Sequence, residues 1–190
     1  MTTEITEIID AECLTLTRDL RRRGATVLAV FALVWAFAAG SGMASVPVAG
    51  VISALAIIVT SYALVTARRG TAGPVTRTVR LPEKWNRWVG LVNAGELVAI
   101  FAVIAASNAS GHPEFIPVGI CLVVGLHFFP LARLFDQRQY TWTAVSLSAV
   151  ALVGLAVLAA GTSAETIRAV VGLGAAVVLW ASSFHVALKG

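Results

Sequence analysis

The sequence predicts an all-α polytopic membrane bundle with six transmembrane helices, preceded by a short amphipathic N-terminal helix. Hydrophobic residues make up 58% of the 190 residues, which exceeds the roughly 45–50% apolar share of soluble domains. At about 20 apolar residues per span, six spans with short connections occupy most of the chain and leave no room for a separate soluble domain. The net charge is +4, but the basic residues lie beside apolar segments, so we expect no nucleic-acid partner.

Residues 1–24 form the predicted N-terminal helix. Apolar residues recur there at spacings typical of one helical face; they include Ile5, Ile8, Ile9, Leu16 and Leu20. Acidic residues occupy much of the polar face, which argues against adsorption onto anionic lipid. We expect this helix to lie on the cytoplasmic side and to pack against the bundle, a second copy or a protein partner.

The transmembrane domain is predicted over residues 25–190. Pro47 suits the first turn of a helix, where its missing N–H leaves no acceptor unpaired. Thr162 and Glu165 have the spacing of a capping box for the last helix. The predicted spans are about 25–45, 47–67, 88–107, 116–134, 142–161 and 163–187.

The basic residues predict the orientation in the cell membrane. With these spans, thirteen of the fourteen lysines and arginines fall on one side, and only Arg168 falls on the other. Because positive residues are retained on the cytoplasmic side, both termini are predicted to be cytoplasmic. The basic connection 68–87 is also predicted to hold anionic lipid headgroups, in addition to its role in topology.

Glu96 is an ionisable residue well inside the third predicted span, and Asn93 shares its helix face. A carboxylate in hydrocarbon is costly unless it is paired, neutralised or hydrated, so such a residue is a functional candidate. Pairs of small residues on this helix would let a neighbouring backbone approach closely, so we expect the helix to lie inside the bundle. These pairs are Gly90 with Ala94 and Gly95 with Ala99.

His127 occupies the fourth span at a depth similar to that of Glu96, about 12 Å from the cytoplasmic end. Pro130 cannot donate to the carbonyl of Leu126, so a helix kink is predicted beside the histidine. We therefore predict that Glu96 and His127 can meet in one layer. The alternative is that both residues only satisfy local hydrogen bonds and fix helix packing.

The stretch from Gly125 to Phe135, GLHFFPLARLF, resembles a segment of uncharacterised small multi-helix bacterial integral membrane proteins. The resemblance covers eleven residues. It implies a multi-pass membrane protein and transfers no activity, cofactor or site residue.

His185, near the end of the last span, is a further candidate for a proton relay. It lies about 9 Å from His127 in depth, which is too far for two axial ligands of one haem. No spacing typical of a metal, phosphate or nucleophile motif occurs. We therefore predict neither a metal nor another cofactor.

Three functions remain open from the sequence. The first is movement or sensing of a proton or small solute, with Glu96 as the titrating group and His127 as its partner. The second is a structural or assembly role without transport or catalysis. The third is an intramembrane enzyme that modifies a lipid or isoprenoid, although the sequence favours a protein that is not an enzyme. This third function would need a cavity open to lipid and lined by aromatic residues such as Trp35, Phe128, Phe129 and Trp180.

Overall fold

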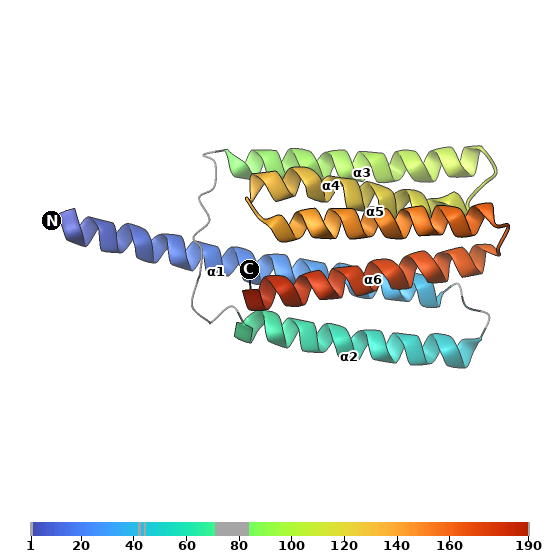
Figure 1. Ribbon diagram of the computed structural model, residues 1–190, viewed down its shortest axis with the longest axis horizontal. Coiled ribbons are helices and arrows are strands. Elements are labelled where there is room, and N and C mark those ends of the chain that lie inside the picture. Colours follow the sequence, from blue (N-terminus) through green and yellow to red (C-terminus); the bar gives the residue numbers. More distant parts are fainter. Residues whose placement is uncertain (1, 42, 44, 71–83, 190) are drawn as a thin grey trace.

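The computed structural model describes residues 2–41, 43, 45–70 and 84–189. They form a bundle of long helices that run side by side along one axis (Figure 1). Six of these are long and apolar enough to cross a membrane, as the sequence predicted. They are α1 (Thr2–Gly40), α2 (Val46–Gly70), α3 (Trp85–Ala109), α4 (Phe115–Leu134), α5 (Arg138–Ala159) and α6 (Ala164–Lys189).

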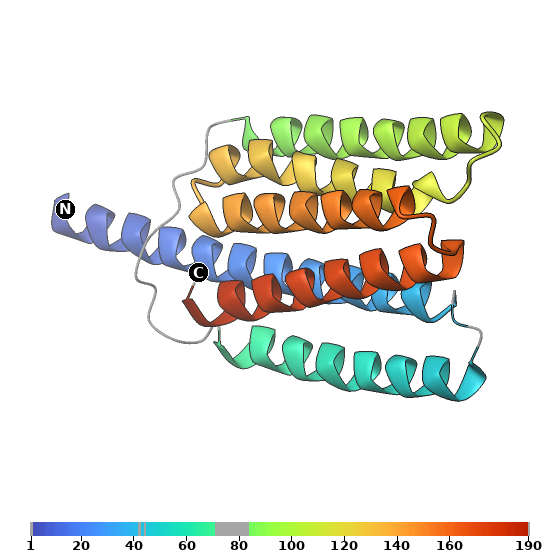
Figure 2. The same cartoon turned by 45° about the vertical axis from the view of Figure 1, so that its right-hand side comes forward.

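The prediction of a separate amphipathic N-terminal helix is wrong. Helix α1 runs without a break from Thr2 to Gly40, and its apolar spanning segment begins at Leu14. Its first turns extend beyond the other helices (Figures 1 and 2). The physical reason is that no proline interrupts this part of the chain, and a single glycine at position 24 weakens a helix without ending it.

The helices lie in the spatial order α3, α4, α5, α6, α1, α2, with α6 and α1 forming the most extensive contact. Helix α2 packs against α1 and α6. Helix α3, in contrast, packs only against α4 within the described part of the chain. The expectation that α3 lies inside the bundle is therefore wrong. Its small residues leave a face without a partner, because neither Gly90 nor Gly95 has a neighbouring atom where a side chain would begin.

Glycine is instead required where the central helices approach most closely. A Cβ atom on Gly172 of α6 would lie 2.7 Å from Cβ of Ala39 and 2.9 Å from the carbonyl oxygen of Trp35, both in α1. Gly125 of α4 lies against Ser148 of α5 in a similar way. Small residues at such contacts let backbones pack closely, which is how helices associate without a hydrophobic driving force in lipid.

Polar side chains join neighbouring helices at a few buried points. Ser183 of α6 donates to the carbonyl oxygen of Ala25 in α1 at 2.8 Å. Trp180 of α6 donates through Nε1 to the hydroxyl of Thr60 in α2 at 3.0 Å. These bonds satisfy polar groups internally, as a lipid environment demands.

Two buried serines allow a matched test of such bonds. We expect Ser183→Ala to lower the free energy of unfolding by about 0.5–1.5 kcal/mol, because a hydrogen bond between helices is lost. The hydroxyl of Ser148 is buried and has no hydrogen-bond partner among the described residues, so Ser148→Ala should leave stability unchanged or raise it slightly. Reversible unfolding in mixed SDS–detergent micelles measures both effects. Equal losses in the two variants would contradict the assignment.

The start of α6 differs from the predicted capping box. Ser163 is the capping residue: its hydroxyl accepts the backbone N–H of Thr166 at 3.2 Å. Thr162 instead donates back to the carbonyl oxygen of Val157 at 2.9 Å. Because Gly161 turns the chain with φ of +74°, the helix starts one residue later than the T-x-x-E spacing implies.

The connection between α3 and α4 contains a pair of ionisable side chains. Nδ1 of His112 lies 2.9 Å from Oε1 of Glu114. A hydrogen bond from its own backbone N–H, and then the one from His112, hold the pKa of Glu114 below its ordinary value. Because the folded pKa is the lower one, this contribution to stability is complete above the unfolded pKa and is lost as pH falls through the folded pKa.

We therefore expect Glu114→Gln to lower the melting temperature slightly at neutral pH. The variant and the wild type should converge as the pH falls through the lowered pKa of Glu114, because the wild-type carboxylate also becomes protonated there. Melting curves over a pH series in detergent measure the difference. A gap between the two proteins that widened in acid would contradict the pairing.

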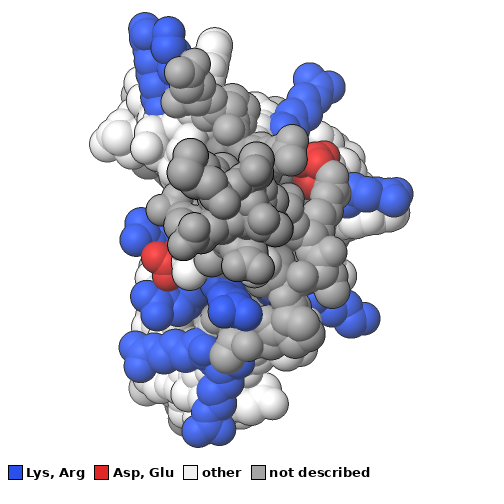
Figure 3. All heavy atoms as spheres, turned by 90° about the vertical axis from the view of Figure 1, so that its left-hand side faces the viewer, with Lys and Arg blue, Asp and Glu red and all other residues white. Residues whose placement is uncertain are grey.

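Basic side chains gather at the end of the bundle where α1 enters and α6 finishes (Figure 3). Among the described basic residues, only Arg168 lies toward the opposite end of the bundle, near the start of α6. Residues 71–83, which hold Arg77, Arg80 and most of the predicted lipid-binding connection 68–87, lie outside the described residues.

Candidate functional site

Glu96 and His127 face each other across the contact between α3 and α4. Oε1 of Glu96 lies 3.2 Å from Nδ1 of His127, and the two side chains are 19% and 13% exposed. The helices bring them together because α3 packs only against α4 among the described helices, so a residue at the same depth on the facing side of α4 becomes its neighbour. Their depths could be read from the sequence, whereas this facing orientation could not.

The same nitrogen of His127 also lies 2.6 Å from the carbonyl oxygen of Val124. A carbonyl oxygen only accepts, so Nδ1 must carry a proton and donate to it. The N–H is therefore directed to Val124, and the carboxyl group of Glu96 lies beside the same nitrogen at the longer distance of 3.2 Å. Nε2, the other ring nitrogen, is left to accept or carry a second proton. The imidazole can therefore change its protonation at Nε2 while the hydrogen bond from Nδ1 to Val124 is kept.

Pro130 lies one turn beyond the histidine. Helix α4 continues through this proline as far as Leu134, so the predicted kink remains a prediction. The carbonyl that His127 binds belongs to Val124, three residues earlier, and not to Leu126, whose usual donor the proline removes.

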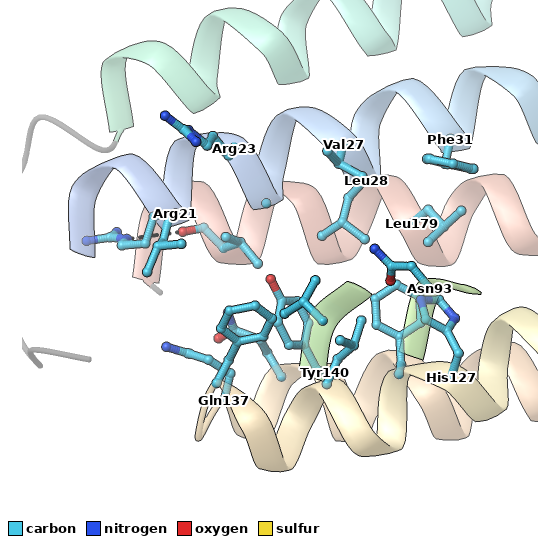
Figure 4. Close-up of a pocket in the computed structure, with 18 of the residues that line it drawn as sticks. Arg21, Arg23, Val27, Leu28, Phe31, Asn93, His127, Gln137, Tyr140 and Leu179 are labelled. Atoms are coloured by element: carbon cyan, nitrogen blue, oxygen red, sulfur yellow. Dashed lines mark hydrogen bonds between the residues drawn. The ribbon is translucent and has the colours of Figure 1, made fainter. Parts of the chain in front are cut away.

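A cavity of about 500 Å³ adjoins this pair. It lies between α1, α3 and α4, and is closed toward the bundle interior by residues of α5 and α6. Figure 4 shows Asn93 and His127 near one end of this cavity and Arg21 and Gln137 near the other. Its walls are mainly apolar and aromatic; they include Leu28, Phe31, Trp85, Val89, Phe128 and Leu179. A volume of this size suits a ligand of a few tens of atoms or fewer.

Arginines line the other end of the cavity, on the basic side of the bundle. Arg21 is only 6% exposed; its Nε and Nη2 atoms donate to the carbonyl oxygens of Val186 and Ala187 at 3.4 and 3.3 Å. These carbonyls belong to the last turn of α6, where a positive charge is favourable. Arg23 is exposed and lies 3.8 Å from Asp19. Arg21 therefore caps α6 as well as lining the cavity.

The structure separates the predicted site residues into two groups. Glu96, His127 and Asn93 all line the cavity, whereas His185 is exposed and does not line it. Of the aromatic residues expected for a lipid-modifying site, Phe128 lines the cavity, but Trp35, Phe129 and Trp180 do not. Sequence reasoning missed Phe31, Arg21 and Tyr140, which helix faces alone could not assign to one space.

Within the described residues, no three histidine, cysteine, aspartate or glutamate side chains gather as metal ligands do. Cys121 is a free, buried thiol, and its sulfur donates to the carbonyl oxygen of Leu147 at 3.4 Å. The ionisable groups available at the cavity are therefore a carboxyl group, an imidazole, two guanidinium groups and a phenol.

Six apolar helices and a cavity that ends on a carboxyl–imidazole pair define a multi-span membrane protein. The chain belongs to a family of unknown function, DUF7010, whose model matches residues 84–186. This match takes in α3 to α6, and so includes both Glu96 and His127. No curated protein and no solved structure matches the chain.

The resemblance drawn from residues 125–135 is supported only as far as this family, because the stretch lies inside the matched region. Nothing in the match indicates a bacterial source. It also assigns no transport, catalysis or ligand.

Proposed function

We propose that this protein binds a small solute in the cavity and takes up or releases a proton at Glu96 and His127 as it does so. The protein would thereby move or sense the solute or the proton. The observation that carries the proposal is the 3.2 Å contact between these side chains at the wall of a 500 Å³ cavity. A titratable pair beside such a space in a membrane bundle is a functional candidate by default.

The proposed switch depends on which acceptor, Val124 or Glu96, the N–H of His127 binds. With Glu96 ionised, the N–H of His127 can turn toward the carboxylate; with Glu96 protonated, it returns fully to Val124. Among the described helices, α3 packs against α4 alone, so His127 is the described titratable group that faces Glu96 across this contact. The other charged or titratable groups around the cavity are Arg21, Arg23 and Tyr140. A change at the pair would therefore act mainly on the position of α3 relative to α4.

Glu96→Gln tests the proposal, with Glu165→Gln as the matched control on the exposed first turn of α6. We expect infrared titration of the protein in nanodiscs to show a carboxylic-acid band that is present in the wild type and control and missing from Glu96→Gln. Proton movement into proteoliposomes, followed with an enclosed pH-sensitive dye, should fall at least about tenfold in the same variant. Identical titration and proton movement in all three proteins would refute the proposal.

A structural role is the second candidate, and the position of α3 at the edge of the bundle favours it. The pair lies at the contact that holds α3 to its one neighbour among the described helices, so it could serve only to fix that helix. In that case Glu96→Gln would lower thermal stability and leave proton movement unchanged. A partner bound through the N-terminal end of α1 belongs to the same candidate, and deletion of residues 1–13 would release it.

We also propose that both termini lie in the cytoplasm. The gathering of arginine and lysine at one end supports this orientation. Labelling of single cysteines in intact cells tests it: a cysteine in place of Ser163 should react with an impermeant maleimide, and one in place of Lys189 should not.

A further inference from the structure

The cavity is not sealed on the side where α1 and α3 pass each other. These two helices line it together, but their backbones do not come close to one another among the described residues. Val27 and Phe31 of α1 both line the cavity, yet each is 53% exposed. They lie about 6 and 12 Å along the helix from Arg23. At that depth the surroundings of a spanning helix are acyl chains, so the cavity opens sideways into the bilayer.

Glu96 has unused capacity to accept hydrogen bonds. Its described polar contact is with Nδ1 of His127 at 3.2 Å, and the N–H of that nitrogen is hydrogen-bonded to the carbonyl oxygen of Val124 at 2.6 Å. A carboxylate offers about four acceptor positions. The ligand chemistry that fits this end of the cavity is therefore a group that donates hydrogen bonds, and most favourably one that carries positive charge.

The rest of the lining favours a cation over an anion. Phe31, Trp85 and Phe128 line the cavity, and aromatic rings can attract organic cations. The arginines lie toward the other end of the cavity from His127 (Figure 4), where Arg21 caps α6 and Arg23 lies beside Asp19. A ligand that entered from the bilayer would also reach Glu96 without passing these arginines.

We infer that the cavity takes a lipophilic amine dissolved in the membrane, which enters between α1 and α3 and binds through its N–H groups to Glu96. This inference rests on the proposed function and names its solute. The amine crosses the opening in its neutral form. The O–H bond of protonated Glu96 then breaks and an N–H bond forms on the amine, so a carboxylate and an ammonium group are left paired. The reverse transfer releases the amine to the bilayer.

Binding of tritiated propranolol, an aromatic secondary amine, tests the ligand class. In scintillation-proximity measurements on the full chain in nanodiscs, we expect saturable binding that unlabelled propranolol displaces and its neutral N-acetyl derivative does not. Glu96→Gln should weaken binding about tenfold or more. Glu96→Asp, which keeps the carboxylate, should retain most of it, and Glu165→Gln should match the wild type.

Two results would overturn the ligand class: equal displacement by the N-acetyl compound, or wild-type affinity in a folded Glu96→Gln protein. Either would leave the infrared titration of Glu96 unaffected, since that measurement uses no amine. Failure of the ligand class is thereby distinguishable from failure of the proposed function.

A cross-link across the opening tests the route. Val27→Cys and Val89→Cys place one thiol on each helix at the cavity, in a background with Cys13→Ser and Cys121→Ser. After reaction with a short bis-maleimide, we expect association and dissociation of propranolol both to slow at least about tenfold, with little change in affinity. The uncross-linked double-cysteine protein is the control. Unchanged rates in the cross-linked protein would overturn entry between α1 and α3.

Discussion

Gly172→Ala is expected to destabilise the protein by about 1–3 kcal/mol, the usual cost of overpacking a tight contact. The added methyl group would lie 2.7 Å from Cβ of Ala39 and 2.9 Å from the carbonyl oxygen of Trp35. The first of these atoms is a methyl group fixed on the helix, and the second belongs to the helix backbone. Neither is part of a flexible side chain that could move away. The helices α1 and α6 would have to separate at the most extensive contact of the bundle.

Gly90→Ala is the matched control, because no atom lies within 4 Å of the position its Cβ would take. There the intrinsic helix preference of alanine should leave stability unchanged or raise it by up to about 1 kcal/mol. Reversible unfolding in SDS–detergent micelles compares the two variants. Similar free energies of unfolding for Gly172→Ala and Gly90→Ala would show that the close approach of α1 and α6 is wrong.

This contrast explains where sequence reasoning about small residues fails. Val-Gly-Leu triplets recur at 89–91, 124–126, 153–155 and 171–173; as repeats they align no halves of the chain. In the structure, the glycines of the last three lie at tight contacts between helices, whereas Gly90 faces open space. A small residue shows that a close approach is sterically possible. Which helix approaches depends on the order of helices around the bundle, which local pattern does not specify.

The number of spanning helices was predictable because it depends on length and hydropathy alone. The continuity of α1 is not evident from the sequence, because the change from charged to apolar composition near residue 24 resembles a boundary between two helices. Composition changes where a helix enters the membrane, but the backbone hydrogen bonds continue across that point. A proline or a capping residue would have been needed to end the helix there.

For the candidate site, the sequence predicted the depth of Glu96 and His127 in the membrane but not the residues that surround them. Residues eight positions from the membrane boundary on two adjacent helices lie at one level by geometry. Whether Glu96 and His127 also face each other depends on the rotation of each helix about its axis. The cavity adds Phe31 and Tyr140 from helices that are distant in sequence, and no local pattern connects them.

His127→Leu is expected to cost about 1–3 kcal/mol of stability, because it removes the side chain that contacts a partly buried carboxyl group. Leucine has a similar size, so the loss would come from the missing donor and not from a large void. Glu96 would then remain without a described polar contact in an apolar wall. The free energy of unfolding in mixed micelles measures the cost. An unchanged value would show that the contact between Glu96 and His127 does not contribute to stability.

The double variant Glu96→Leu/His127→Leu separates a stabilising pair from a functional one. Removing both partners takes away the unpaired group as well as the bond, and such replacements are often neutral or stabilising. We expect the double variant to regain at least about 1 kcal/mol relative to His127→Leu alone, yet to lose the proton movement that we propose for the wild type. Recovered stability without activity would mean that the carboxyl–imidazole pair is not needed to hold α3 against α4. A double variant less stable than either single variant would instead assign the pair to helix packing.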